Sequence, residues 1–84
     1  MNVHFTPTAL EHYQYWKEND LSKITKIKAL LENIKQTPFL GIGKPEPLKG
    51  NLAGYWSRRI TQEHRLVYKV TATDLTIIQC RFHY

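Results

Sequence analysis

Several side chains in the second half of the chain have the chemistry needed to act on a phosphodiester. Glu46 lies between two prolines, which fix the backbone on either side of it. His83 is one residue from the end, and Arg59, Arg65 and Arg81 come from three separate segments. A carboxylate, an imidazole and several guanidinium groups together satisfy the chemical requirements of RNA cleavage.

RNA is cleaved without a metal when the neighbouring 2′-hydroxyl attacks the phosphorus. A base must take the hydroxyl proton, an acid must protonate the leaving 5′-oxygen, and cations must stabilise the extra charge on the phosphorane. A carboxylate suits the first task and an imidazolium the second. A guanidinium suits the third, because its planar fork offers phosphate two donors at once.

Each of these residues also has an ordinary structural explanation. Glu46 taken alone is a solvated loop carboxylate, Arg59 a surface cation, and the C-terminal histidine part of a frayed end. Arg65 is close in sequence to two carboxylates with which it could pair, Glu63 and Asp74. It is the combination, and not any one residue, that indicates RNA cleavage.

Other chemistries have weaker support. The segment Gly41-Ile42-Gly43-Lys44 lacks the spacing and the hydroxyl residue of a phosphate-binding loop. Cys80 is the only cysteine, and we expect it to face the core. No metal-ligand spacing links the histidines at positions 4, 12, 64 and 83. We therefore expect neither a metal nor another cofactor.

The charge distribution indicates a polyanionic partner. Residues 1–43 carry five basic and four acidic side chains, a net charge of +1, and residues 44–84 carry seven and three, a net charge of +4. All four arginines lie in the second part. A basic, arginine-weighted half is typical of nucleic-acid binding, although it also serves solubility in small domains.

Length and composition predict one small globular domain over residues 1–84. Hydrophobic residues make up 42% of the chain and charged residues 23%, which is ordinary for folded proteins. No apolar run is long enough to cross a bilayer, and the first residues do not resemble a secretory signal. With a lone cysteine, these features predict a cytoplasmic protein with no membrane association.

Two helices are predicted in the first half. Thr6 and Pro7 form a helix start, and Leu10, Tyr13 and Trp16 recur at three-residue spacing, which predicts a helix over about 7–18. Asp20 is placed to cap a second helix over about 21–36, which Pro38 ends. Its expected apolar stripe consists of Leu21, Ile24, Ile27, Leu31 and Ile34. Its other faces carry Lys23, Lys26, Lys28, Glu32 and Lys35.

Strands are predicted in the second half. Residues 2–5 are extended, residues 38–54 form a loop rich in proline and glycine, and strands follow over 55–60, 65–70 and 75–84. Helices followed by hairpin-connected strands predict an α+β domain. We expect two N-terminal helices packed on one face of a twisted, mainly antiparallel sheet.

Alternation along these strands divides the side chains between two faces. The set expected to pack against the helices is Trp56, Ile60, Leu66, Val70, Ile78, Cys80 and Phe82. The open face is then expected to gather Arg59, Arg65, Arg81 and His83, and to include Ile77. Residues far apart in sequence would thus form one basic surface.

Six blocks of sequence carry a resemblance to a known family. They are Tyr13-Gln14-Tyr15-Trp16, Thr37-Pro38-Phe39, Gly43-Lys44-Pro45-Glu46-Pro47-Leu48-Lys49, Trp56-Ser57-Arg58-Arg59-Ile60-Thr61, Glu63-His64-Arg65-Leu66-Val67-Tyr68 and Cys80-Arg81-Phe82-His83-Tyr84. The chain resembles, over essentially its whole length, the YoeB/Txe toxins of bacterial type II toxin–antitoxin modules, which have the RelE-like fold. One departure is Phe82, at a position where relatives can carry tyrosine.

The resemblance implies an mRNA interferase, a ribosome-dependent endoribonuclease that cuts messenger RNA in the decoding site. It implies that Glu46 is the general base, His83 the general acid and Arg65 the residue that stabilises the transition state. Positions around the scissile phosphate and the bases would fall on Lys49, Arg59 and Tyr84, and the expected open face adds Arg81.

The resemblance also implies partners. These are a cognate antitoxin of the YefM type, the 70S ribosome and messenger RNA. The family resemblance is also compatible with a homodimer. The alternative function is a non-catalytic basic module of the same fold that binds RNA or the ribosome, or a toxin of that fold that acts on another target. Glu46, Arg65 and His83 occurring together favour the enzyme.

Overall fold

The computed structural model describes residues 1–83, and Tyr84 lies outside the described residues. One strand and both long helices come first along the chain, and the other four strands follow them. The elements are β1 (Asn2–Phe5), α1 (Pro7–Asn19), α2 (Leu21–Gln36), β2 (Glu46–Pro47), a short 3₁₀ helix (Gly50–Leu52), β3 (Trp56–Arg59), β4 (Arg65–Val70) and β5 (Asp74–Gln79).

Both helices begin with the caps that the sequence predicts. Thr6 Oγ1 accepts a hydrogen bond from the backbone N–H of Ala9 at 3.2 Å, and Pro7 is the first residue of α1. Asp20 separates the helices, and its carboxylate accepts from the backbone N–H of Ser22 at 3.0 Å. The predicted range of the second helix is confirmed.

The sheet has five strands in the order β1-β5-β4-β3-β2. Strand β1 runs parallel to β5, and all other neighbours are antiparallel. The predicted α+β architecture with a mainly antiparallel sheet is confirmed. The sequence does not reveal that residues 2–5 pair with β5, or that Glu46 and Pro47 form an edge strand inside the expected loop.

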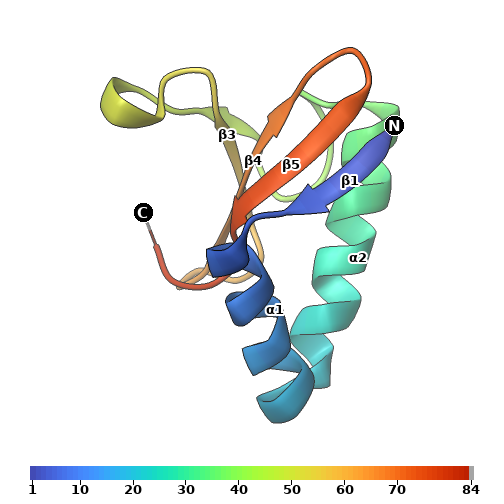
Figure 1. The fold of residues 1–84 in the computed structure, drawn as a ribbon, viewed down its shortest axis with the longest axis vertical. Helices are drawn as coiled ribbons and strands as arrows, with labels where there is room; N and C mark the ends of the chain where they lie inside the picture. The colour runs from blue at the N-terminus through green and yellow to red at the C-terminus, as the bar shows by residue number, and fades with distance from the viewer. Residues whose placement is uncertain (84) are drawn as a thin grey trace.

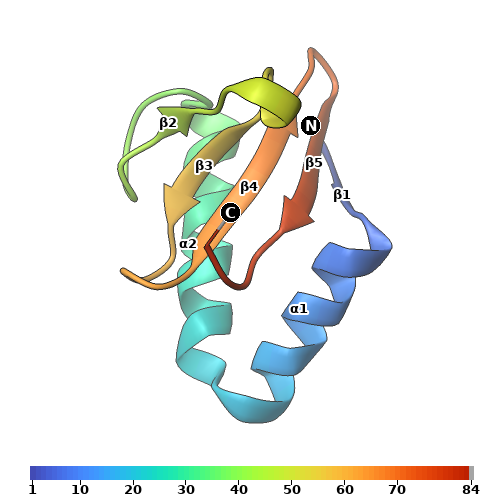
Figure 2. The same ribbon diagram turned by 90° about the vertical axis from the view of Figure 1, so that its left-hand side faces the viewer.

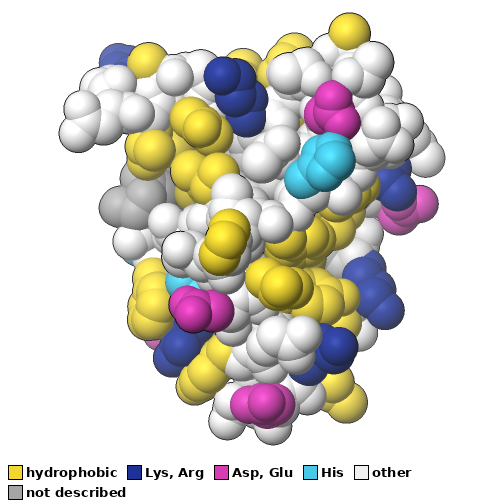
Figure 3. Space-filling view, viewed as in Figure 1, with side chains coloured by type: hydrophobic (Ala, Val, Ile, Leu, Met, Phe, Trp, Pro, Cys, Tyr) yellow, Lys and Arg dark blue, Asp and Glu magenta, His cyan; other side chains and the backbone are white. Residues whose placement is uncertain are grey.

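Helix α2 runs along one face of the sheet, whereas α1 lies at the end of β1 and β5 (Figures 1 and 2). The core between them is formed by Ala9, Trp16, Ile24, Ile27, Leu30, Ile34, Ile60, Leu66, Tyr68, Leu75, Ile77 and Cys80. A shallow apolar pocket between β1 and α2 includes Val3, Phe5, Tyr13 and Leu31, and hydrophobic side chains gather on this side of the surface (Figure 3).

Two residues of the predicted helix stripes are not in the core. Leu10 is 48% exposed and Leu21 is 67% exposed. Ala9 and Trp16 are the buried residues of α1, so the inner face of that helix passes through Ala9 and not through Leu10. Leu21 is the first residue of α2, and Leu30 is buried in that helix.

A β-bulge changes which side chains of β5 face the core. Tyr68 pairs with Ile77 and Val67 pairs with Gln79, so Ile78 is an extra residue in β5. Ile77 is fully buried, and the next fully buried residue is Cys80, three positions later. The prediction that Ile78 faces the core and Ile77 the open face is wrong, because the bulge interrupts the period of two.

The chain leaves regular strand structure after Gln79. Strand alternation predicts a strand over 75–84 with Phe82 in the core, but β5 ends at Gln79. Phe82 is 51% exposed and has a positive φ of 68°. Both views place this C-terminal end on the side of the sheet away from α2 (Figures 1 and 2).

Candidate active site

The sheet register brings the carboxylate and two arginines to one face. Glu46 pairs with Ser57 across β2 and β3, and Arg59 pairs with Arg65 across β3 and β4. Paired residues share a face, and Ser57 and Arg59 are two residues apart on one strand. Glu46, Arg59 and Arg65 therefore lie on the same open face, on three neighbouring strands. For the two arginines, this is the face that the alternation of side chains predicts.

The position of Glu46 is fixed by the loop before it. The backbone N–H of Arg59 donates to the carbonyl of Gly43 at 2.7 Å, which holds the loop against β3. Gly43 has a φ of 81°, and a Cβ there would lie 2.9 Å from Leu30 Cδ2 and 3.1 Å from Arg58 Cβ. Glycine thus permits the close approach that delivers Glu46 to the sheet edge. The side chain of Glu46 is exposed.

Arg65 is a cation held in place by backbone oxygens. Its side chain is 8% exposed, and Nη1 donates to the carbonyls of Thr61 and Gln62, each at 2.8 Å. A third bond, at 3.2 Å, goes to the carbonyl of His64. Among residues 1–83, Arg65 forms no ion pair with either of the carboxylates considered from sequence. A charge oriented in this way needs little reorganisation when an anion binds.

Arg59 adds exposed positive charge to the open face, and Lys49 is exposed shortly after the adjoining strand β2. Arg59 is exposed directly opposite Arg65, and like charges in opposite positions repel each other. An anion that lies against both guanidinium groups removes this repulsion. Lys49 follows β2 and precedes the 3₁₀ helix, and it is also exposed. The open face is therefore suited to phosphate.

The backbone at Phe82 is hydrogen-bonded to Arg65 and to the residue before it. The backbone N–H of Arg65 donates to the carbonyl of Phe82 at 2.9 Å, and the backbone N–H of Phe82 donates to His64 Nδ1 at 2.8 Å. His83 is the next residue and is exposed. These bonds place the backbone before His83 at the start of β4. The predicted contact residue Tyr84 lies outside the described residues.

Arg81 does not join the other arginines on the open face. Its Cζ lies 3.3 Å from the centroid of the Tyr15 ring on α1 and 4.4 Å from that of Phe82. Its Nε is buried and has no hydrogen-bond partner among the described residues. The expected placement of Arg81 is wrong, because the bulge and the end of β5 turn its side chain towards α1.

Arg58 is a structural residue that sequence analysis overlooked. It is fully buried, and its guanidinium donates to the carbonyls of Thr37, Leu40 and Ile42 at 2.7, 2.8 and 3.1 Å. Further bonds go to Tyr68 Oη and to Asn33 Oδ1. The signal was present, since alternation puts Arg58 on the face of Trp56 and Ile60. Arg58 ties the end of α2 to the loop that leads to Glu46.

Three residues that contact or belong to the backbone before His83, namely His12, His64 and Cys80, have shifted pKa values. Burial lowers the pKa of His64, and the cations Lys23, Arg81 and Arg65 act in the same direction. Burial and Arg81 lower the pKa of His12. Burial raises the pKa of Cys80 to about 12, so this thiol is a poor nucleophile.

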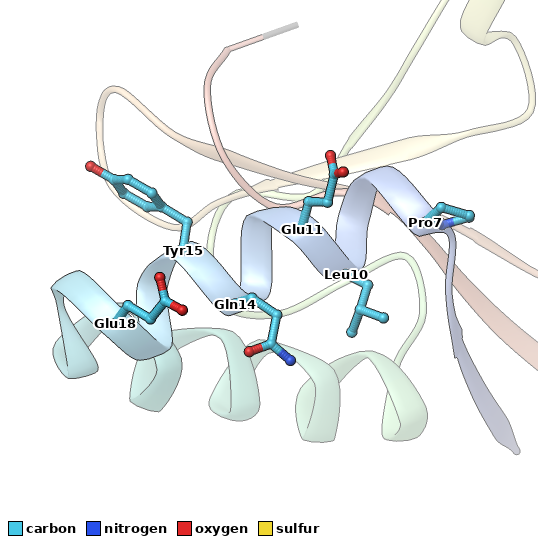
Figure 4. Close-up of a pocket in the computed structure, with 6 residues that line it drawn as sticks. All are labelled: Pro7, Leu10, Glu11, Gln14, Tyr15 and Glu18. Carbon is cyan, nitrogen blue, oxygen red and sulfur yellow. The ribbon is translucent and has the colours of Figure 1, made fainter.

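Further features of residues 1–83 lie outside the open face, although the pocket described next includes Tyr15, on which Arg81 stacks. A pocket along the exposed side of α1 is lined by Pro7, Leu10, Glu11, Gln14, Tyr15 and Glu18, and it offers apolar and acidic groups rather than a phosphate site (Figure 4). Within residues 1–83, no three His, Cys, Asp or Glu side chains converge as metal ligands would. No helix in the same range is long and apolar enough to span a membrane.

Comparison with known proteins places this architecture among toxins of toxin–antitoxin systems. The family model that describes the YoeB-like toxin of bacterial type II toxin–antitoxin systems matches residues 5–84. The Toxin YoeB of a Synechocystis strain is 52% identical over 84 residues, which cover all of this chain and 98% of the relative. The chain belongs to the YoeB-like toxin family, and the resemblance seen in its sequence is confirmed.

Solved structures agree with this family. A YoeB/ParE toxin from Agrobacterium tumefaciens superposes with a TM-score of 0.97 at 52% identity, with both chains fully covered. A YoeB dimer from Staphylococcus aureus gives 0.95 at 48% identity, and a YoeB–YefM complex from that species gives 0.92 at 47%. Each of these two matches covers 100% of this chain and 98% of the other. The chain is thus a toxin of the type II class in fold and family.

Proposed function

We propose that this toxin is an mRNA interferase that cleaves messenger RNA in the A site of the ribosome. The observation that carries the proposal is the common location of Glu46, Arg59 and Arg65 on the open face, with the residue before His83 hydrogen-bonded to Arg65. Family membership adds the toxin role. Translation stops because the cut message has lost its downstream codons.

The three candidate catalytic residues divide the reaction between them. Glu46 accepts the proton of the 2′-hydroxyl, whose oxygen attacks the phosphorus. The bond from phosphorus to the 5′-oxygen breaks, and His83 donates a proton to that oxygen. Arg65 stabilises the additional negative charge on the phosphorane. The products are a 2′,3′-cyclic phosphate and a 5′-hydroxyl, and no metal or other cofactor takes part.

Substrate binding uses cations around this centre. Lys49 and Arg59 contact phosphates next to the scissile one, since both are exposed on or beside the open face. Tyr84 contacts the bases, as the family resemblance implies. Arg81 remains a proposed RNA contact, now at the margin of the site, because its guanidinium is stacked between aromatic rings.

The partners follow from charge and from relatives. A net charge of +5 favours an acidic antitoxin segment of the YefM type as well as ribosomal and messenger RNA. The relative from Staphylococcus aureus in complex with YefM supports the antitoxin, and the dimer of the same protein supports a homodimer. A ribosomal target implies a cytoplasmic location, to which the single buried cysteine is suited.

Translation in vitro tests the proposed function. Adding the protein to a translating system should produce messenger fragments whose 3′ ends map to the A site and carry a cyclic phosphate. The matched control is the same message without ribosomes. Intact message in the presence of ribosome-bound protein would overturn the proposal and favour the alternative, a non-catalytic basic module that only binds RNA or the ribosome.

A further inference from the structure

The C-terminal segment, defined here as residues 80–83, is attached to the rest of the molecule by two imidazole rings. The backbone N–H of Cys80 donates to His12 Nδ1 at 3.2 Å, and that of Phe82 donates to His64 Nδ1 at 2.8 Å. Regular sheet pairing has ended at Gln79, so no neighbouring strand takes these two donors. The histidines come from α1 and from the turn before β4.

The carbonyl groups of the same two residues are bonded as well. Trp16 Nε1 donates to the carbonyl of Cys80 at 2.8 Å, and the backbone N–H of Arg65 donates to that of Phe82 at 2.9 Å. Cys80 and Phe82 thus have both backbone groups satisfied by the body of the protein. This accounts for a fixed path of a segment that lacks secondary structure.

The ring of His64 is held in a defined orientation. It contacts the Trp16 ring edge to face, with centroids 4.8 Å apart and an interplanar angle of 83°. The Phe82 ring also lies near it, with centroids 6.4 Å apart. His12 makes a similar contact with Phe82, at 5.6 Å and 85°. Both rings therefore keep Nδ1 directed at the segment.

A backbone N–H can only donate, so each Nδ1 must be without a proton in this arrangement. The neutral ring satisfies this requirement with its proton on Nε2, whereas the imidazolium carries protons on both nitrogens and cannot accept. Protonation of either ring breaks one attachment of the segment. The protonation state of two residues outside the catalytic set thereby controls the backbone next to His83.

We propose that His12 and His64 are positioning residues which, as neutral imidazoles, hold the C-terminal segment in the path that delivers His83 to the active site. Acid releases the segment because the imidazolium rings cannot accept from Cys80 and Phe82. The consequence for cleavage rests on the proposed function, but the attachment itself does not.

The charged groups around the two rings favour neutral imidazoles near neutral pH, and therefore intact hydrogen bonds to the C-terminal segment. The groups facing His64 are Glu63, which favours its protonation, and Lys23, Arg81 and Arg65, which oppose it. Those facing His12 are Arg81, which opposes protonation, and Glu11, which favours it. Burial opposes protonation of both, and each pKa lies below the ordinary value of 6.5. The attachment is thus complete above that value and is lost as the pH falls through the lowered pKa values.

Amide hydrogen exchange tests the attachment without reference to activity. In the wild-type protein, the protection factors of the Cys80 and Phe82 amides should fall as the pH is lowered from about 8 to about 5. His64→Leu should remove the protection of Phe82 at every pH. His64→Asn, whose side-chain oxygen can accept in place of Nδ1, should restore it and remove its pH dependence. The matched control is His4→Asn, since His4 lies on β1 and pairs with Asp74.

Cleavage by the same variants tests the consequence for His83. His64→Leu should lower kcat by about 10²-fold with little change in ribosome affinity, as expected for a misplaced catalytic group, and His64→Asn should recover most of it. Unchanged Phe82 protection in His64→Leu would overturn the attachment. Lost protection with full kcat would overturn the positioning role. A wild-type protein that never cleaves would instead overturn the proposed function, and the exchange data would still decide whether the rings hold the segment.

Discussion

Arg65 donates its backbone N–H to the carbonyl of Phe82 at 2.9 Å, and this bond joins the start of β4 to the end of the chain. Arg65 is a candidate catalytic residue, and the next residue after Phe82 is another, His83. Their relative position therefore depends on this backbone bond. Disturbing either end of this bond should affect both groups.

Stability depends strongly on the buried cation Arg58. Replacing it with alanine leaves the carbonyls of Thr37, Leu40 and Ile42 and the side chain of Asn33 without their donor. We expect Arg58→Ala to lower the free energy of unfolding by about 3–5 kcal/mol, as measured by urea denaturation. The control Arg59→Ala removes an exposed arginine and should change it by less than about 0.5 kcal/mol. Equal denaturation midpoints for the two variants would contradict the structural role of Arg58.

The reactivity of Cys80 reports opening of the C-terminal segment. Its pKa of about 12 makes the thiolate about 10³-fold scarcer near pH 8 than for a thiol with the ordinary value of 9.0. The native protein should therefore react with iodoacetamide about 10³-fold more slowly than the same chain in denaturant. Mass spectrometry gives both rates, and the absence of any other cysteine makes the modification unambiguous. Comparable rates would indicate that the segment opens freely in the native state.

Ribosome binding should depend on salt through part of the α2 surface. Lys23 pairs with Asp20 and Lys35 pairs with Glu32, each at 2.8 Å, so their charges are already compensated. We expect Lys26→Gln with Lys28→Gln to weaken binding and to reduce the slope of log K against log salt by about 0.7–0.9 per lost phosphate contact. Sedimentation with ribosomes at several salt concentrations measures the slope. Lys35→Gln serves as the control, and an unchanged slope in the double variant would place the contact surface elsewhere.

Much of the fold could be predicted from periodicity and capping. The spacing of Ile24, Ile27 and Ile34 and the caps at Thr6 and Asp20 determine the helices locally, and the structure has both. Alternation also placed Arg59 and Arg65 on one face. These features depend only on neighbours in the chain, which is why the sequence is sufficient for them.

The features that sequence analysis missed depend on distant contacts. The bulge at Ile78 shifts the period of β5 and sends Arg81 to Tyr15, but nothing in the local residue types marks it. Alternation marks Arg58 as facing the core, but the carbonyls that accept from its guanidinium belong to a segment that is separated from it in sequence. The attachment of the backbone before His83 to the start of β4 follows from hydrogen bonds made by Phe82, a residue that alternation assigned to the core.

The division of labour in the active site predicts how substrate and enzyme changes combine. A message with 2′-deoxyribose just before the cut should bind but remain intact, because the nucleophile is missing. Glu46→Gln and His83→Gln should each fold, bind ribosomes and lose about 10²–10⁴-fold in cleavage rate. Arg65→Ala should lower turnover more than binding, since its charge matters most when the phosphorane forms.

Single-turnover cleavage on ribosomes, with ribosome affinity measured separately, distinguishes these effects, and urea denaturation checks that each variant is folded. Combining Glu46→Gln with the 2′-deoxy message should cost nothing beyond the deoxy substitution, because the base then has no proton to remove. Cleavage of the deoxy message, or a product with a 5′-phosphate, would exclude attack by the 2′-hydroxyl. Either result would require water as the nucleophile, and Glu46 would then have to activate that water or give way to another base.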